Sequence, residues 1–151
     1  MKAKPGECYE NAGHEFLFGE FAGRADARLV HGYPTLQRPP YARFGHAWVE
    51  TVEATLSVGD SVFEVIVCHD PSNGAVLPRE LYYAIGCIDP ALCSRFDHAA
   101  ASARAVETGE WGAWNESPPD ALFASRPQGR RTRPQGRARR TSQPTSQRPP
   151  R

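Results

Sequence analysis

The sequence predicts an α+β domain followed by a basic tail, and three observations support this prediction. Residues 8–18 and 99–107 have the composition or spacing of helices. Residues 44–70 contain two runs rich in Val, Thr, Phe and Ile on either side of Gly59-Asp60, which is typical of a β-hairpin. From residue 117 onward the composition changes. We therefore expect a domain over residues 1–116, in which an N-terminal helix packs on a small antiparallel sheet.

Composition narrows the class of protein. The chain has 151 residues, of which 40% are hydrophobic, so it is sized for one domain. No window approaches the ~18 apolar residues of a membrane span, and the N-terminus lacks the apolar stretch of a signal peptide. These observations predict a cytoplasmic protein without a membrane partner.

The four cysteines form no C-x-x-C pair and match no familiar zinc spacing. In a cytoplasmic protein this favours free thiols over a disulfide framework. We therefore expect neither a bound metal nor another cofactor.

The first elements follow from local signals. Glu7 and Glu10 suit the N-terminal end of a helix over residues 8–18, and Gly19 is placed to end it. Residues 27–33 are expected to form a short strand. The proline-bearing segment 34–43 cannot lie inside a sheet, so we expect an exposed loop.

The hairpin then sets two polar side chains near each other. His46 opens the first strand and Asp70 closes the second, so folding about Gly59 brings them roughly opposite, on the same face. His69 is adjacent to Asp70 in a strand and must point to the other face, which makes it a poor partner.

The remaining elements complete the domain. Residues 71–74 are a turn cluster, and the apolar run 79–88 is interpreted as a further strand. Residues 99–107 should form a helix that ends before Gly109. Trp111 and Trp114 are expected to close the core.

The tail over residues 117–151 has the opposite charge to the domain. All 17 acidic residues but only half of the 18 basic ones lie at or before Asp120, so the first 120 residues carry −8 and the last 31 carry +9. Low apolar content predicts disorder. The tail is a candidate for nucleic-acid binding through its arginines, or a solvated segment that contacts the acidic domain. The candidate contacts are Arg130, Arg131, Arg137, Arg139 and Arg140.

Cys8, His46 and Asp70 are the candidate catalytic residues. A cysteine in the first turn of a helix is placed where free N–H groups favour a thiolate, and a carboxylate beside an imidazole fixes its tautomer. The alternative is a small buried cysteine, a strand histidine and a turn aspartate. Spacing alone does not show that Cys8 packs against His46.

The motifs Cys8-x-x-Asn-Ala, His46-Ala-Trp and Asp70-Pro resemble a group of small bacterial and phage proteins. His-Ala-Trp followed by Asp-Pro is also similar to papain-like and transglutaminase-like thiol enzymes, in which Cys opens a helix, His opens a strand and Asp lies on the next strand. The resemblance spans residues 7–114. It implies a papain-like or transglutaminase-like fold with Cys8 as nucleophile, His46 as base and Asp70 as its orienting group.

The resemblance implies an acyl-transfer enzyme that acts on a protein or peptide carboxamide, as a peptidase, amidase, deamidase or transglutaminase. No glutamine precedes Cys8 as one does in papain-like enzymes, so the oxyanion would rely on the Cys8 N–H and on Asn11, a weaker candidate. Trp48 shares the face of His46 and is either a wall of the site or a core residue. The alternative function is a non-catalytic phage-type protein that binds a host protein or nucleic acid.

Overall fold

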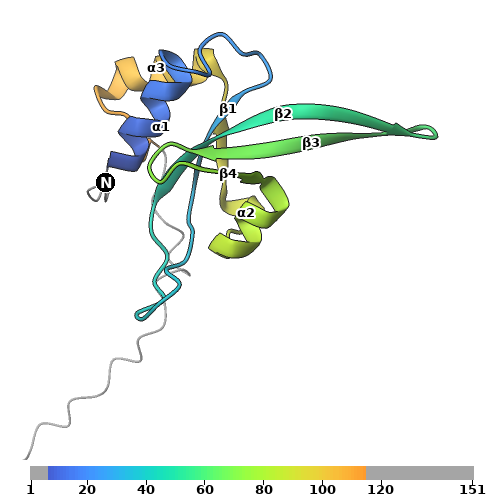
Figure 1. The fold of residues 1–151 in the computed structure, drawn as a ribbon. Helices are drawn as coiled ribbons and strands as arrows, with labels where there is room; N and C mark the ends of the chain where they lie inside the picture. Colours follow the sequence, from blue (N-terminus) through green and yellow to red (C-terminus); the bar gives the residue numbers. More distant parts are fainter. Residues whose placement is uncertain (1–6, 115–151) are drawn as a thin grey trace, which may run out of the picture.

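The computed structural model describes residues 7–114, which form three helices and a five-stranded sheet (Figure 1). The predicted N-terminal helix and hairpin are both present, and the chain is α+β as expected. In chain order the elements are α1 (Glu7–Leu17), β1 (Arg28–Gly32), β2 (His46–Val58), β3 (Ser61–Asp70), β4 (Ala75–Pro78), α2 (Arg79–Gly86), a 3₁₀ turn (Pro90–Leu92), β5 (Ser94–Phe96) and α3 (His98–Thr108).

The strands form one antiparallel sheet in the order β4-β3-β2-β1-β5. α1 and α3 contact each other, and α1 packs on β1 and β2, whereas α2 packs on β3 and β4. Figure 1 shows α1 and α3 together at one side of the sheet and α2 below β4.

Alternation along the central strands creates two hydrophobic cores. Leu29 and Val49 contribute to the core that includes Phe16 of α1, and their neighbours Val30 and Trp48 contribute to a second core with Tyr83 of α2. Because successive side chains of a strand point to opposite faces, one pair of adjacent strands supports helices on both sides.

The hairpin turns where the sequence predicts, at Gly59, whose φ of 58° is readily adopted by glycine. A β-bulge lies between Val52 and Ala54, and beyond it β2 and β3 project from the rest of the domain as a two-stranded arm (Figure 1). Leu56 and Phe63 pair across this arm and are 53% and 55% exposed. The arm therefore adds little to the core, and the inner half of the hairpin supplies the side chains of β2 and β3 that are buried in the two cores.

The prediction of a strand over residues 79–88 is wrong, because most of this run is α2. The apolar positions 81, 82, 83 and 85 fit neither a clean twofold nor a clean helical repeat over so short a stretch. Burial of Tyr83 against Trp48 selects the helix. The predicted helices 8–18 and 99–107 are confirmed as α1 and α3, and α3 is followed by Gly109 in the left-handed conformation.

Two further predictions concern the ends of the chain and the membrane. Residues 115–151 lie outside the described part of the chain, and with them the predicted basic tail and its five named arginines. Within residues 7–114, none of the helices has the length and apolar character needed to cross a membrane.

Candidate active site

His46 and Asp70 form a close pair at the inner end of the hairpin. Val49 pairs with His69, so the residue opposite Asp70 is Trp48, and His46 lies two positions further along on the same face. The predicted pairing thus occurs diagonally rather than directly across. Nε2 of His46 lies 2.8 Å from Oδ2 of Asp70, and the two side chains are only 12% and 1% exposed.

Asp70 is held in place by three further donors. Its Oδ2 accepts hydrogen bonds from the Asn73 amide at 2.8 Å and from the Tyr82 hydroxyl at 2.9 Å, and its Oδ1 accepts one from the Ser72 N–H at 3.0 Å. The Ser72 bond is the Asx-turn contact typical of Asp at the start of a turn. Both carboxylate oxygens are therefore fixed before any substrate is present.

The surroundings favour the charged forms of both groups. Burial opposes protonation of His46, but hydrogen bonds to Asp70 and Cys8 and the negative charges of both outweigh it and raise the pKa of His46 to about 9. Burial likewise acts to raise the pKa of Asp70, yet the hydrogen bond and positive charge of His46, with Tyr82 and Ser72, lower it on balance. At neutral pH the site holds an imidazolium paired with a carboxylate.

Cys8 reaches this pair from the opposite side of the sheet. Its helix, α1, packs on the face away from α2, so the thiol approaches His46 around the end of β2. Sγ of Cys8 lies 3.9 Å from the Gly45 carbonyl oxygen, directly before His46. Cys8 is among the neighbours that raise the pKa of His46. Because Nε2 of His46 is bonded to Asp70, Nδ1 is the ring nitrogen left to face the thiol. The three predicted catalytic side chains are thus brought together.

Two glycines allow α1 to dock this closely. A Cβ at Gly45 would lie 2.4 Å from the hydroxyl oxygen of Tyr9, and a Cβ at Gly112 would lie 2.1 Å from its ring. The side chain of Tyr9 therefore fills the space between two bare backbone segments. Because Tyr9 adjoins Cys8, this clamp sets where the thiol lies relative to His46.

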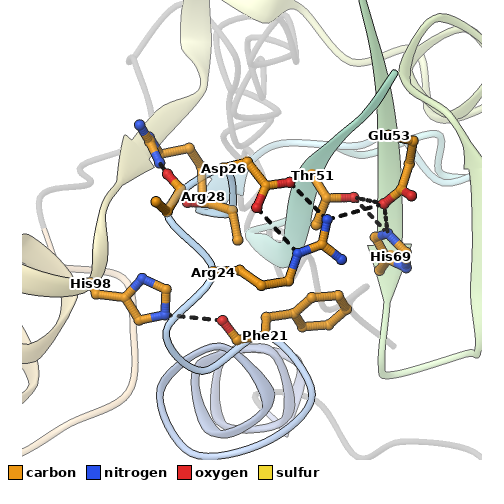
Figure 2. Close-up of polar contacts among 10 residues, drawn as sticks. Phe21, Arg24, Asp26, Arg28, Thr51, Glu53, His69 and His98 are labelled. Atoms are coloured by element: carbon orange, nitrogen blue, oxygen red, sulfur yellow. Dashed lines mark hydrogen bonds and ion pairs between the residues drawn. The ribbon is translucent and has the colours of Figure 1, made fainter. Parts of the chain in front are cut away.

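The second histidine of the hairpin is committed elsewhere, as Figure 2 shows. Nε2 of His69 lies 2.9 Å from the Thr51 hydroxyl oxygen and 3.8 Å from the Glu53 carboxylate. Glu53 also pairs with Arg24, at 3.4 Å. Burial lowers the pKa of His69 despite these acidic neighbours. His69 thus belongs to the network that ties the loop after α1 to the hairpin.

A cavity of about 310 Å³ opens beside the pair and is lined in part by His46, Asp70 and Tyr82. A larger cavity, of about 390 Å³, lies around Glu50 and Arg95. Its principal charges already neutralise each other, since Arg95 donates to Glu50 at 2.9 Å. Of these two cavities, the smaller one adjoins the His46–Asp70 pair.

The other predicted site residues lie at the margin. Asn11 lines a separate small cavity with Pro71 and residues of its own helix. Trp48 is fully buried, with its ring 6.2 Å from that of His46, and belongs to the core behind the site rather than to the cavity wall. Among residues 7–114, no group of three or more His, Cys, Asp or Glu side chains is arranged to hold a metal ion.

Sequence reasoning missed Asn73, Tyr82 and the Tyr9 clamp. The Asn73 contact was readable, because Asp-x-x-Asn in a turn cluster is a pattern for side-chain bonds to the first residue. Tyr82 was hidden by the wrong assignment of α2. Nothing in the local sequence of Tyr9 signals that Gly45 and Gly112 receive its side chain.

Comparisons of the chain with protein-family models, with curated proteins and with solved structures yielded no significant match, so the geometry of the site carries the functional argument.

Proposed function

We propose that the protein is a cysteine-nucleophile acyl-transfer enzyme with a papain-like or transglutaminase-like arrangement of Cys8, His46 and Asp70. The observation that carries the proposal is the buried His46–Asp70 pair, beside which Cys8 lies against the Gly45 carbonyl and contributes to the raised pKa of His46. The order of a cysteine on the first helix, a histidine opening a strand and an aspartate closing the next strand supports it. The substrate is a carboxamide or peptide bond.

In the first half of the reaction, Sγ of Cys8 attacks the carbonyl carbon of the substrate. Thiol enzymes of this type place a cationic imidazole beside the attacking sulfur, and the raised pKa of His46 fits that role. A carbon–sulfur bond forms and the carbonyl electrons move onto oxygen. When they return, the carbon–nitrogen bond breaks, and His46 gives its proton to the departing amine, which leaves a thioester on Cys8.

In the second half, neutral His46 takes a proton from water or from an acceptor amine as that molecule attacks the thioester. The carbon–sulfur bond breaks and the thiolate is restored beside the imidazolium. Water yields a carboxylic acid, as in a peptidase, amidase or deamidase, and an amine yields a new amide, as in a transglutaminase. Asp70 keeps the ring oriented throughout, since its other hydrogen bonds hold both carboxylate oxygens.

The start of α1 provides a donor for the oxyanion. The first N–H groups of a helix have no acceptor within the helix, and Cys8 is the second residue of α1. Its backbone N–H is therefore available to the negative oxygen that develops next to its own Sγ.

Thiol alkylation tests the proposal, and the chain supplies its own reference in Cys87, which is free and exposed. At pH 6 we expect iodoacetamide to modify Cys8 at least about tenfold faster than Cys87, because the proposed mechanism requires a nucleophilic sulfur beside the His46 imidazolium. The rates are measured by mass spectrometry of peptides from the full-length chain.

His46→Ala is the decisive variant. It should bring the rate at Cys8 down to or below that at Cys87, while the rate at Cys87 stays unchanged. Circular dichroism establishes that the variant is folded. Equal rates for the two cysteines in the unmodified protein, or a Cys8 rate that ignores the loss of His46, would refute the triad.

A further inference from the structure

We propose that the cavity beside His46 is a subsite that selects substrates with an uncharged, apolar side chain next to the reacting carbonyl. This rests on the proposed function, because it assigns a substrate class to that same site. Two observations carry it independently of the triad: the chemistry of the cavity walls and the exposed apolar residues at its mouth.

The walls of the cavity come from three parts of the chain that are distant in sequence. Pro34 and Phe44 belong to the long loop before β2, Leu77 to β4, and Ile85 to α2. His46 and Asp70 complete the lining, so a group held there lies against the proposed base. A substrate group bound in this cavity would be anchored against the proposed base His46.

The charges of the cavity are already neutralised. Its charged side chains are His46 and Asp70, which are paired with each other at 2.8 Å. Gln37 directs its amide N–H groups to the carbonyl oxygens of Thr35 and Ile85. A charged side chain would lose its hydration here without gaining an ionic partner, which is strongly unfavourable. An apolar side chain pays no such penalty and gains by leaving water.

The mouth of the cavity exposes apolar side chains to solvent. Phe44 and Ile85 both line the cavity, yet they are 40% and 53% exposed. They extend the apolar lining outward to where the chain of a bound substrate would leave. The volume of about 310 Å³ is at the small end of ligand sites and leaves room for a large aliphatic or aromatic side chain.

The experiment uses acyloxymethyl ketones, in which the Cys8 thiolate forms a carbon–sulfur bond and displaces a carboxylate. Two series are compared, acetyl-Ala-Xaa and acetyl-Xaa-Ala, with Leu, Phe, Asp or Lys as Xaa. Leu and Phe probes should label Cys8 at least about tenfold faster than Asp and Lys probes in one of the two series. Similar rates for all four side chains in both series would overturn the subsite.

The variant Ile85→Lys makes the test specific to this cavity. Because Ile85 is half-exposed, the substitution should leave the fold intact. The new cation should slow labelling by the Leu and Phe probes and accelerate labelling by the Asp probe. Leu81→Lys is the matched control, since Leu81 is 47% exposed on the same helix and does not line the cavity. An equal response of the two variants would contradict the assignment.

Iodoacetamide separates failure of the subsite from failure of the proposed function. It is small and needs no subsite, so its rate at Cys8 reports the triad alone. Fast iodoacetamide labelling with no preference among the ketones would remove the subsite and leave the triad in place. Loss of both would reject the function as well.

Discussion

Asp70 is the most constrained polar residue of the site. Four donors reach its carboxylate, from β2, from the following turn and from α2. One of them is the charged base, and the other three fix the carboxylate in the position that the base requires. The positioning residues Asn73 and Tyr82 therefore act on His46 only through Asp70.

Replacing Tyr82 with Phe should raise the pKa of Asp70, because the hydroxyl donates to its charged form and helps to lower that pKa. We also expect a loss of about 1.5–3 kcal/mol in the free energy of unfolding, typical for a hydrogen bond to a charged group. The pKa is followed by carboxyl carbon NMR and the stability by urea unfolding.

Tyr83→Phe is the matched control for this change. It removes the same atom from the neighbouring residue, whose hydroxyl donates to the buried Glu50 at 2.6 Å. A comparable loss of stability is expected, with no change in the titration of Asp70. If both variants shift Asp70 alike, Tyr82 has no specific positioning role.

At the scale of elements, the critical contact is that between α1 and the start of β2. Tyr9 lies between Gly45 and Gly112, and its ring also packs edge-on against His31. The helix carries Cys8, and the close approach of its third side chain, that of Tyr9, to bare backbone determines the position of the helix. A small substitution at Gly45 should therefore shift the position of Cys8.

Gly45→Ala should slow iodoacetamide labelling of Cys8 and lower the melting temperature, since the new Cβ would lie 2.4 Å from the Tyr9 hydroxyl. The double variant with Tyr9→Phe should recover much of both losses. Without the hydroxyl, the nearest ring atom would be an ordinary 3.5 Å away. The readout is a double-mutant cycle; additive effects of the two substitutions would show that this contact does not set the position of α1.

Element prediction succeeded where a signal was local. The Gly59 turn and the alternation on either side of it defined the hairpin, and the acidic first turn located α1 to within one residue. It failed at α2, where packing of Tyr83 on Trp48 decides between helix and strand. The three-residue β5 exists through its pairing with β1 and has no signal of its own.

At the scale of the whole molecule, two buried histidines should shape the pH dependence of stability. Burial among the rings of Tyr9, Phe96 and Trp114 lowers the pKa of His31 to about 4 from its ordinary 6.5. As pH falls from 6.5 toward 4, the unfolded chain takes up a proton that the folded chain refuses, so stability declines, by up to about 3 kcal/mol. His46 has the opposite shift, and the stability it contributes is fully present below pH 6.5 and lost as pH rises through about 9.

Urea unfolding across this range should therefore show highest stability near pH 6.5, as far as these two groups decide it. His31→Phe should flatten the limb between pH 6.5 and 4. Asp70→Asn should flatten the alkaline limb, because it removes the main group that raises the pKa of His46, and it should also reduce the loss of stability in stronger acid, where Asp70 itself takes up a proton. A curve that keeps both limbs in both variants would assign the pH dependence to other groups.

Local sequence patterns predicted the His46–Asp70 pair of the candidate site but not the approach of Cys8, which depends on the packing of the whole molecule. His46 and Asp70 share one hairpin, so face alternation alone relates them, and even the two-residue offset in register keeps them on one face. Cys8 reaches them through contacts between segments far apart in the chain, which no local pattern encodes. The resemblance to thiol enzymes suggested that meeting, and the glycines that permit it became visible only in three dimensions.

The clamp on Tyr9 also determines at which stage of synthesis the surroundings of Cys8 can form. Cys8 is made among the first residues, whereas His46, Asp70 and the second glycine of the clamp follow much later, with Gly112 near the end of the described chain. A nascent chain that has not yet extruded Gly112 holds its thiol without the surface that positions it. The surroundings that position Cys8 are therefore complete only once the chain has been made as far as Gly112.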